Sequence, residues 1–424
     1  MYRRARATFQ ALEPRTLFAA VNVADFSAVP NDGVNDTPAI QAAINASAAG
    51  DTIQFGSGVY DIGRIHLSSS RAYNGATATT LRSTGEEYAL DLREDARDVT
   101  ITHLRMEGAG IAIGRGQTTT NVRIAENTFA DISTHAIRST LYSDRLVTEK
   151  NTFVNIRGYG VLDAYHTNRL SFSYNRIIDS VHGGHILGPL NDNRFVGNFM
   201  SGIEIMGLEI QRDPSATSVS QTLLVADNVI WDWRLPNGGS FGLSVVAEGG
   251  LNTIIRSNYL RNNIAPGSTW NPDLRGQGYT LGPAIEAGFE TGVVENNVSG
   301  GPTQWTAHVG AAGLNMLVRN NKFYGHAQYG QYIFPWPSIY GTGTFIDQDN
   351  LKDPNGANMP AVPLLPGDAN SDGSVDLRDW SALAGNMGRT NATLAQGDFN
   401  GDRVVNLIDF NILTANFGRE LWPA

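Results

Sequence analysis

The hydrophobic pattern of this chain repeats along much of its length. In the clearest copies, residues 122–129, 146–153 and 170–177, apolar side chains lie five or three residues before an asparagine, and another lies two residues after it. These asparagines are Asn127, Asn151 and Asn175, which gives a period of about 24 residues. Looser copies carry Asn198, Asn228, Asn258, Asn297 and Asn321, and an earlier copy has Leu104 in the asparagine position.

A fixed period of this length is typical of stacked repeats. The β-branched and aromatic residues alternate and are separated by Gly and Asn, which indicates strands and turns rather than helices. Asparagines stacked in register can hydrogen-bond along a ladder, so we assign them a structural role. The sequence therefore predicts a mostly β solenoid whose turns are about one repeat long.

A different pattern precedes the repeats. Residues 21–26 are predicted to form a strand, residues 31–36 a turn, and residues 37–46 a helix with Asp36 or Thr37 as its cap and Pro38 in its first turn. Ile40 and Ile44 share one face of that helix. A helix placed there would cover the open end of the solenoid core, where strand edges would otherwise be exposed.

The segment DGVNDTPAIQAAINA, followed by GDTIQFGSGVYDI, resembles the N-terminal part of the pectate-lyase superfamily. With the repeats, the resemblance covers about residues 21–350 and implies a right-handed parallel β-helix with an N-terminal capping helix. That superfamily includes lyases, glycoside hydrolases, epimerases and non-enzymatic tailspike-like proteins. The resemblance therefore implies a fold but no single reaction.

Two twelve-residue loops, 368–379 and 398–409, recur thirty residues apart near the C-terminus. Oxygen-bearing side chains at loop positions 1, 3, 5, 9 and 12, with a backbone carbonyl at position 7, match the way such a loop wraps calcium. The expected ligands are Asp368, Asn370, Asp372, Ser374, Asp376 and Asp379 in the first loop, and Asp398, Asn400, Asp402, Val404, Asn406 and Asp409 in the second. Each loop runs into a helical segment, and Trp380, Leu383, Phe410 and Leu413 are expected to form a small core.

Residues 367–420 resemble a dockerin type I domain, which implies two Ca²⁺ sites and a cohesin-like protein partner. Arg403 replaces the glycine expected at position 6 of the second loop, which predicts strain there. The pairs Leu377-Arg378 and Leu407-Ile408 match the partner-reading positions of the family but are not its common small hydroxyl pairs. Calcium binding is therefore better supported than capture by a standard cohesin.

Composition narrows the remaining possibilities. The net charge of −10 argues against nucleic acid as a partner, and the absence of cysteine removes disulfides and thiol chemistry but leaves the redox compartment open. No apolar run is long enough to predict a membrane span.

The basic start and the Leu-Glu-Pro-Arg segment at 12–15 resemble an export signal, so residues 1–20 are interpreted as a targeting segment of an extracellular or cell-surface protein; the alternative is a disordered basic tail. Residues 351–366 are expected to form a linker.

Catalysis on a β-helix requires ionisable side chains that face outward on neighbouring turns. Aligning short glycine-bounded strands predicts one outward line of Ala112, His185, Glu204, Ser244, Glu286 and His308. Glu204 and Glu286 would lie two turns apart, about 9–10 Å, which suits an acid and a base in inverting glycoside hydrolysis. The catalytic candidates are therefore Glu204, Glu286 and His185; the alternative is that these glutamates make ordinary surface contacts. A register error of one residue would reverse every assignment.

Other reactions remain open. A polysaccharide lyase would need a base and a cation beside a uronate carboxylate, and Arg138, Arg157, Arg212 and Arg234 are available. The motif set expected of a polygalacturonase is missing from the sequence. The sequence thus predicts a polysaccharide hydrolase or lyase, or else a non-catalytic glycan-binding or cell-surface adhesion protein; a self-assembling surface-layer component is a third class. Residues that could flank the site are Asp163, His166, His182, Glu248, Trp231, Trp233, Trp270 and Trp305.

Overall fold

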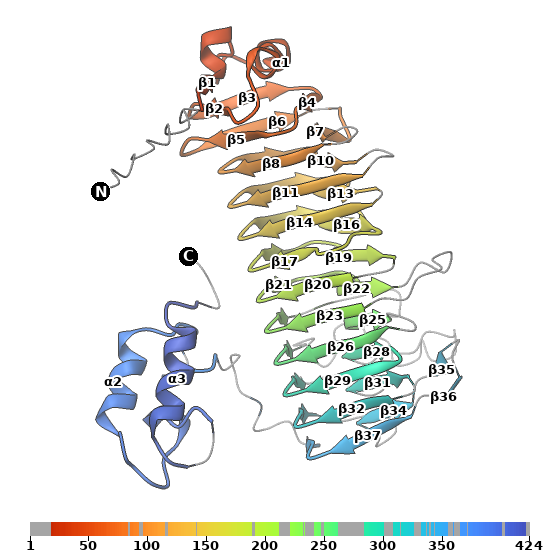
Figure 1. Ribbon diagram of the computed structural model, residues 1–424, viewed down its shortest axis with the longest axis vertical. Coiled ribbons are helices and arrows are strands. Elements are labelled where there is room, and N and C mark those ends of the chain that lie inside the picture. Colours follow the sequence, from red (N-terminus) through yellow and green to blue (C-terminus); the bar gives the residue numbers. More distant parts are fainter. Residues whose placement is uncertain are drawn as a thin grey trace, which may run out of the picture.

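The chain winds into a long parallel β-helix followed by a small helical module (Figure 1). The computed structural model describes residues 18–420, except for 84, 93–95, 115–117, 141, 189–190, 212–220, 232, 234–240, 247–249, 262–283, 301–307, 314, 326–331, 336, 339–340, 343, 355–358, 360–364, 371 and 401–402. Three parallel sheets, here called A, B and C, form the walls of the β-helix in this part of the chain. The fold class predicted from the repeats is confirmed.

Each turn of the β-helix contributes one strand to each sheet. Sheet A contains β1 (Ala20–Asn22), β2 (Thr52–Phe55), β5 (Arg71–Gly75), β8 (Arg97–Thr102), β11 (Thr119–Ala125), β14 (Ser143–Glu149), β17 (Ser171–Ser173), β20 (Asn191–Val196), β23 (Gln221–Ala226), β26 (Leu251–Arg256), β29 (Thr291–Glu295), β32 (Asn315–Arg319) and β37 (Phe345–Gln348). Sheet B contains β3 (Gly58–Ile62), β6 (Thr79–Ser83), β9 (Arg105–Glu107), β12 (Thr128–Ile132), β15 (Thr152–Ile156), β18 (Arg176–Ile178), β21 (Phe199–Ser201), β24 (Val229–Trp231), β27 (Tyr259–Arg261), β30 (Val298–Gly300), β33 (Lys322–Tyr324) and β38 (Leu351–Asp353). Sheet C contains β4 (Ile65–Leu67), β7 (Tyr88–Leu92), β10 (Gly110–Ile113), β13 (Ile137–Ser139), β16 (Leu162–Tyr165), β19 (His182–Leu187), β22 (Met206–Gln211), β25 (Phe241–Val246), β28 (Ile285–Gly288), β31 (Val309–Ala312) and β34 (Ile333–Pro335). A short antiparallel pair, β35 (Pro337–Ser338) and β36 (Gly341–Thr342), lies outside these sheets.

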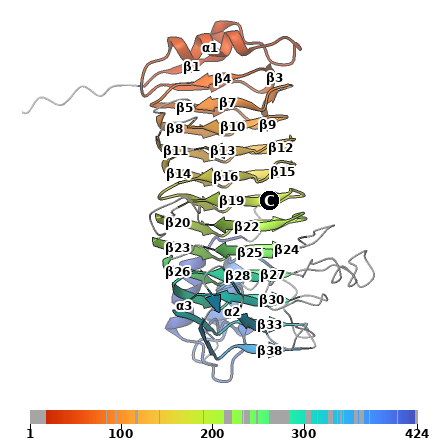
Figure 2. The same ribbon diagram turned by 90° about the vertical axis from the view of Figure 1, so that its right-hand side faces the viewer.

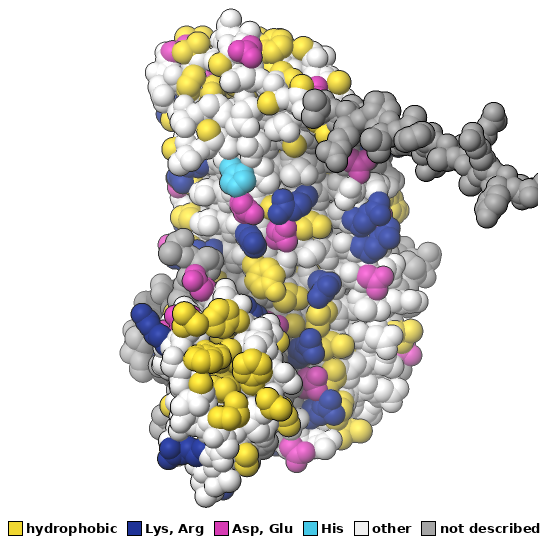
Figure 3. All heavy atoms as spheres, turned by 60° about the vertical axis from the view of Figure 1, so that its left-hand side comes forward, with side chains coloured by type: hydrophobic (Ala, Val, Ile, Leu, Met, Phe, Trp, Pro, Cys, Tyr) yellow, Lys and Arg dark blue, Asp and Glu magenta, His cyan; other side chains and the backbone are white. Residues whose placement is uncertain are grey.

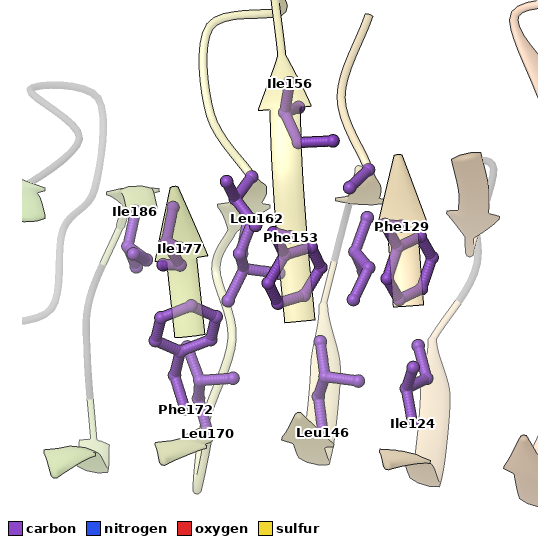
Figure 4. Packing of buried hydrophobic residues seen from close by; sticks show 14 of the residues in the cluster. Ile124, Phe129, Leu146, Phe153, Ile156, Leu162, Leu170, Phe172, Ile177 and Ile186 are labelled. Carbon is purple, nitrogen blue, oxygen red and sulfur yellow. The ribbon is translucent and has the colours of Figure 1, made fainter. Parts of the chain in front are cut away.

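The core is a stack of apolar side chains that point into the β-helix from all three sheets (Figure 4). Because the repeat is about one turn long, equivalent residues of successive turns meet: Phe129 pairs with Phe153, and Phe153 pairs with Ile177. The rings of Phe129 and Phe153 are stacked with centroids 4.9 Å apart. Like residues therefore pack on like residues, and this favours one register of the turns.

The predicted asparagine ladder is confirmed at the corner between sheets A and B. The Nδ2 of Asn151 donates to the Oδ1 of Asn175 at 3.1 Å and to the carbonyl of Ile124 at 2.9 Å, and the same pattern recurs along the ladder. The ladder ends on Asn350, a copy that the sequence pattern did not identify. In the turn before Asn127, where Leu104 occupies the asparagine position, the backbone amide of Leu104 donates to the Oδ1 of Asn127.

The predicted helix at residues 37–46 is confirmed as α1 (Thr37–Ala46). Its Ile40 and Ile44 are buried in the same core as the strands that follow, so α1 covers the N-terminal end of the β-helix. The predicted strand at 21–26 is wrong beyond residue 22: β1 ends there and the 3₁₀ helix η1 (Val23–Phe26) follows. The cause is local, because the Asn22 side chain accepts a hydrogen bond from the amide of Ala24 and turns the chain.

The C-terminal module contains α2 (Leu377–Gly385), the 3₁₀ helix η3 (Leu394–Gln396) and α3 (Leu407–Asn416). Its core is separate from that of the β-helix and includes the predicted Leu383 and Leu413, with Phe410 packed against it. Trp380, which was also expected in this core, is instead 45% exposed. Among the described residues, no helix has the length and apolar character needed to cross a membrane.

Candidate functional sites

One line of outward-facing side chains crosses sheet C, the sheet nearest the viewer in Figure 2. The strand pairing places in this line, in order, Asp91, Ala112, Arg138, Asp163, His185, Glu209, Ser244, Glu286 and Gly310. We call this the sheet C line. The predicted positions of Ala112, His185, Ser244 and Glu286 within one line are confirmed, and the ionisable run from Arg138 to Glu286 is bounded by the small residues Ala112 and Gly310.

The predicted position of Glu204 is wrong. Glu204 lies in the bend between β21 and β22, and its half-exposed side chain forms an ion pair with Arg157. Strand β22 begins at Met206, and it is Glu209 that pairs with His185. Two segments have the same apolar–Glu–apolar pattern, 203–205 and 208–210, and only the second lies in sheet C.

The predicted outward position of His308 is also wrong. His308 is fully buried just before β31, and Gly310 occupies its expected place beside Glu286. Its Nδ1 lies 2.7 Å from the Ser299 Oγ, and its ring stacks against the rings of both Phe323 and Tyr332, which also stack on each other. Burial lowers the pKa of His308 to about 3, so the neutral ring packs as an aromatic side chain.

The centre of the sheet C line is a carboxylate bound to a histidine. The Oδ1 of Asp163 lies 2.8 Å from the Nδ1 of His185, while its Oδ2 lies 3.3 Å from the Nε of Arg138 and 3.7 Å from the Nε2 of His135. Asp163 and His185 are 2% and 6% exposed. A buried carboxylate in this position orients the imidazole and directs its other ring nitrogen away from Asp163.

Glu209 lies beside His185 on the next strand. Its Oε1 accepts a hydrogen bond from the Gln211 side chain at 2.9 Å, and its Oε2 accepts one from the Tyr159 hydroxyl at 3.5 Å. The Tyr159 ring also packs against His182 and His185. Burial raises the pKa of Glu209, although His185 and Tyr159 act in the opposite direction, and burial lowers the pKa of His182 to about 4.

Glu286 follows two strands further along the line. Its Oε2 accepts a hydrogen bond from Ser244 Oγ at 2.5 Å, on the strand between the two glutamates. Burial raises the pKa of Glu286, and the nearby Glu209 raises it further. Two turns separate the backbones of Glu209 and Glu286, about 9–10 Å. Two carboxyl groups with raised pKa values at this spacing can serve as proton donor and proton acceptor.

The other predicted flanking residues divide into three groups. Asp163, His182 and Arg138 lie in or beside the sheet C line, whereas His166 contacts Tyr142 and Arg157 contacts Glu204. Trp231 lies on sheet B, and Trp233 is buried in the β-helix core. Glu248, Arg212, Arg234, Trp270 and Trp305 lie outside the described residues. The sequence analysis missed Glu209 and Tyr159, although the distance from the ladder asparagines would have indicated Glu209.

The two predicted calcium loops have the same internal hydrogen bonds. Asp379 Oδ1 accepts from the amide of Ala369 at 2.8 Å, and Asp409 Oδ1 accepts from the amide of Phe399 at 2.8 Å. The first aspartate of each loop, Asp368 or Asp398, accepts from the amide at loop position 6. Asp368, Asp379 and Asp409 are fully buried, so these carboxylates point into the loops rather than into solvent.

The predicted donor set is made only of oxygens, which calcium prefers. No group of three or more His, Asp or Glu side chains within the described part of the chain is arranged as a metal site; the loops would also need amide and backbone oxygens, and Asp402 lies outside the described residues. Arg403, in place of the expected glycine, adopts a left-handed φ of 68°, as Gly373 does with 86° in the first loop.

The face of the C-terminal module that appears in Figure 3 carries a patch of hydrophobic side chains. The exposed apolar residues of the module are Leu377, Trp380, Met387, Leu407, Ile408 and Phe417. Leu377 and Leu407 are 69% and 71% exposed at equivalent positions, the first residues of α2 and α3. Exposed apolar residues gathered in this way are typical of a protein-binding surface.

Comparison with known proteins identifies the C-terminal module. Residues 366–418 match the dockerin type I domain. No curated protein sequence matches the chain. Among solved structures, the surface adhesin PfbA of Streptococcus pneumoniae is similar, with 13% identity, 80% of this chain and 92% of that chain covered, and a TM-score of 0.56. The catalytic unit of a GH87 α-1,3-glucanase from Streptomyces thermodiastaticus strain HF3-3 is also similar, with 18% identity, 82% and 70% coverage, and a TM-score of 0.51. At these identities the two structures show the fold alone.

Proposed function

We propose that this protein is an extracellular polysaccharide hydrolase whose β-helix carries the active site on the sheet C line and whose dockerin domain attaches it to a partner. The observation that supports this is the pair Glu209 and Glu286, two largely buried carboxyl groups with raised pKa values on one line. Carboxyl groups two turns apart leave room for a water molecule between base and sugar, as an inverting mechanism requires.

The contacts of the two carboxyl groups support an assignment of their roles. Burial raises the pKa of Glu209, whereas His185 and the Tyr159 hydrogen bond oppose that shift, and the Gln211 side chain also donates to its carboxylate. On these opposing contacts we assign Glu209 as the general base that activates water. Burial and the nearby Glu209 raise the pKa of Glu286, against the opposing hydrogen bond from Ser244, so we assign Glu286 as the acid that donates its proton to the departing glycosidic oxygen. His185, oriented by Asp163, lies beside Glu209 on the adjacent strand.

The dockerin domain completes this proposal. Each of the two loops would hold one Ca²⁺ through the predicted ligands, and calcium would fix the starts of α2 and α3. The exposed pair Leu377 and Leu407 would then contact a cohesin-like partner. A catalytic unit attached in this way would act outside the cell, which agrees with the export segment expected at residues 1–20.

The test is the activity of the full chain on a panel of neutral and uronic polysaccharides, with reducing ends and unsaturated products followed together. We expect reducing ends without unsaturation, and a loss of at least about 100-fold in kcat in Glu209→Gln and in Glu286→Gln. Glu204→Gln is the matched control, since Glu204 lies outside the line and should leave activity unchanged.

Two results would contradict the proposal. Unsaturated products that persist in both variants would indicate elimination, with Arg138, which lies within the sheet C line, as the candidate cation. No product from any polymer would favour the second function, a non-catalytic glycan-binding or cell-surface protein.

A further inference from the structure

A polar hollow lies at the corner between sheets A and B, on another flank of the β-helix from the sheet C line. Its volume is about 770 Å³, within the range of ligand pockets. The segment 75–79 borders it, and its polar lining includes Gln54, Asn74, His103, Arg105, Glu126 and Thr128. None of these residues belongs to the sheet C line, and Figure 3 shows that the face opposite sheet C carries charges of both signs.

Hydrogen bonds join the side chains in this hollow across successive turns. Asn74 donates to Gln54 at 3.0 Å and accepts from Thr102 at 2.9 Å, and its Oδ1 also lies 2.9 Å from His103 Nδ1. The His103 Nε2 lies 2.9 Å from the Glu126 Oε2. The chain of contacts holds amide, imidazole and carboxylate groups in fixed positions while His103 and Glu126 stay 53% and 42% exposed.

An aromatic side chain continues the same line of turns. His103, Glu126, Lys150 and Tyr174 each precede the ladder position of their turn, and all four have a left-handed φ of 54–59°. Tyr174 is 46% exposed, and a Cβ at Gly197, on the next turn, would lie 2.6 Å from the Tyr174 ring. The Tyr174 ring therefore occupies the space that a side chain at Gly197 would need, and this half-exposed ring lies on the order of 14 Å from His103.

We propose that this corner is a second, non-catalytic binding site for a neutral polysaccharide, which would run along the β-helix axis from the hollow to Tyr174. Amide and carboxylate groups held in fixed positions can exchange hydrogen bonds with sugar hydroxyls, and a flat tyrosine ring packs against the apolar face of a sugar. The track carries Glu126 together with Arg105 and Lys150, charges of both signs, which favours a neutral polymer over one of uniform charge. The inference rests on the proposed function only in taking a polysaccharide as the ligand.

Binding is tested in the full chain carrying Glu209→Gln and Glu286→Gln, so that the polymer is not consumed. Affinity electrophoresis through gels containing soluble glucans, mannans or xylans gives the dissociation constant. In that background Tyr174→Ala and Glu126→Ala should each weaken binding at least tenfold. Tyr142→Ala changes another exposed tyrosine, just before β14; it is the control and should bind like its parent.

Binding that changes less than twofold in both variants, an equal loss in Tyr142→Ala, or no binding to any neutral polymer would overturn the site. The outcome is separable from that of the hydrolase proposal. If Tyr174→Ala weakens binding while the chain with intact glutamates cleaves no polymer, the binding site is supported and the hydrolase proposal fails. If cleavage depends on the two glutamates but Tyr174→Ala does not change binding, the hydrolase proposal is supported and the binding site fails.

Discussion

At the scale of single residues, burial in this protein gives polar side chains a structural or a chemical role according to their partners. The ladder asparagines are 0–2% exposed from Asn127 to Asn321, and each hydrogen-bonds to the backbone and to the asparagine of the next turn. Glu209 and His185 are almost as buried, but they lie on the outer side of sheet C. The asparagines hold adjacent turns together. In contrast, burial raises the pKa of Glu209, and Asp163 orients the ring of His185.

The substitution Asn175→Ala should therefore lower the stability of the folded protein. The substitution leaves the carbonyl of Thr148 and the amide of Asn151 without their side-chain partner inside the protein. We expect a loss of about 2–3 kcal/mol in the free energy of unfolding, measured by urea denaturation. Asn45→Ala, on the exposed surface of α1, is the control and should change stability by less than about 0.5 kcal/mol; equal losses in the two variants would contradict the role of the ladder.

His308 predicts a pH dependence of stability. Burial lowers its pKa to about 3 in the folded protein, against about 6.5 when unfolded. Between these values the unfolded chain binds a proton that the folded protein does not, so the stabilisation is complete above about pH 6.5 and is lost as the pH falls towards 3. From pH 7 to pH 4 this one group accounts for roughly 3 kcal/mol.

His308→Phe keeps the stacking with Phe323 and Tyr332 but removes the titrating group. Its free energy of unfolding should decrease less than that of the wild type between pH 7 and pH 4, by urea denaturation at each pH. If the two proteins lose the same amount, another group carries the acid sensitivity.

At the scale of elements, the sequence predicted the strands better than their register. Glycine-bounded segments correctly identified the outward positions of Ala112, His185, Ser244 and Glu286, because alternation fixes which residues of a recognised strand point inward. It could not separate segments 203–205 and 208–210, whose alternation is the same. In segment 203–205 the glutamate lies between two isoleucines, and in segment 208–210 it lies between a leucine and an isoleucine. The local pattern therefore cannot show which of the two glutamates lies in sheet C.

Position within the turn resolves that ambiguity. The outward residues Arg138, Asp163 and His185 follow the ladder asparagines 127, 151 and 175 by 11, 12 and 10 residues. Glu209 follows Asn198 by 11 residues, whereas Glu204 follows it by only 6. From Asn228 to Ser244 the distance is 16 residues and from Asn258 to Glu286 it is 28, so longer insertions remove this rule in the later turns.

The second loop of the dockerin domain provides a prediction at this scale. Arg403 adopts φ = 68°, a conformation that costs a residue with a side chain about 1 kcal/mol or more relative to glycine. Arg403→Gly should therefore raise the stability of the domain by about 1 kcal/mol, measured by thermal unfolding in calcium. Arg389→Gly, at a position without a left-handed φ, should lower it; a loss in both variants would show that Arg403 is not strained.

At the scale of the whole molecule, repetition made most of the architecture predictable. The 24-residue period predicted a β-helix and the duplicated loops a calcium-type module, because both patterns recur in the sequence itself. The site was harder to predict from the sequence, because it depends on residues that lie 22 to 42 positions apart in the chain and meet on adjacent strands. Examples are Asp163 with His185 and Ser244 with Glu286. The polar hollow could not be inferred from the repeats, because it depends on the path of segment 75–79, which joins β5 to β6.

The two units also have separate apolar cores, and this predicts separate unfolding. Removal of calcium with EGTA should unfold the dockerin domain, whose buried Asp368, Asp379 and Asp409 would then repel one another without a cation, while the β-helix keeps its own core and ladder. Calorimetry should show two transitions in calcium and the loss of only one in EGTA, with a matching loss of the helical circular-dichroism signal.

In the presence of calcium, the double variant Asp368→Ala/Asp398→Ala should reproduce the effect of EGTA, whereas Asp25→Ala, exposed in η1, should not. A shift of both transitions by EGTA would mean that the units unfold together, and no shift of either would mean that the loops do not bind calcium.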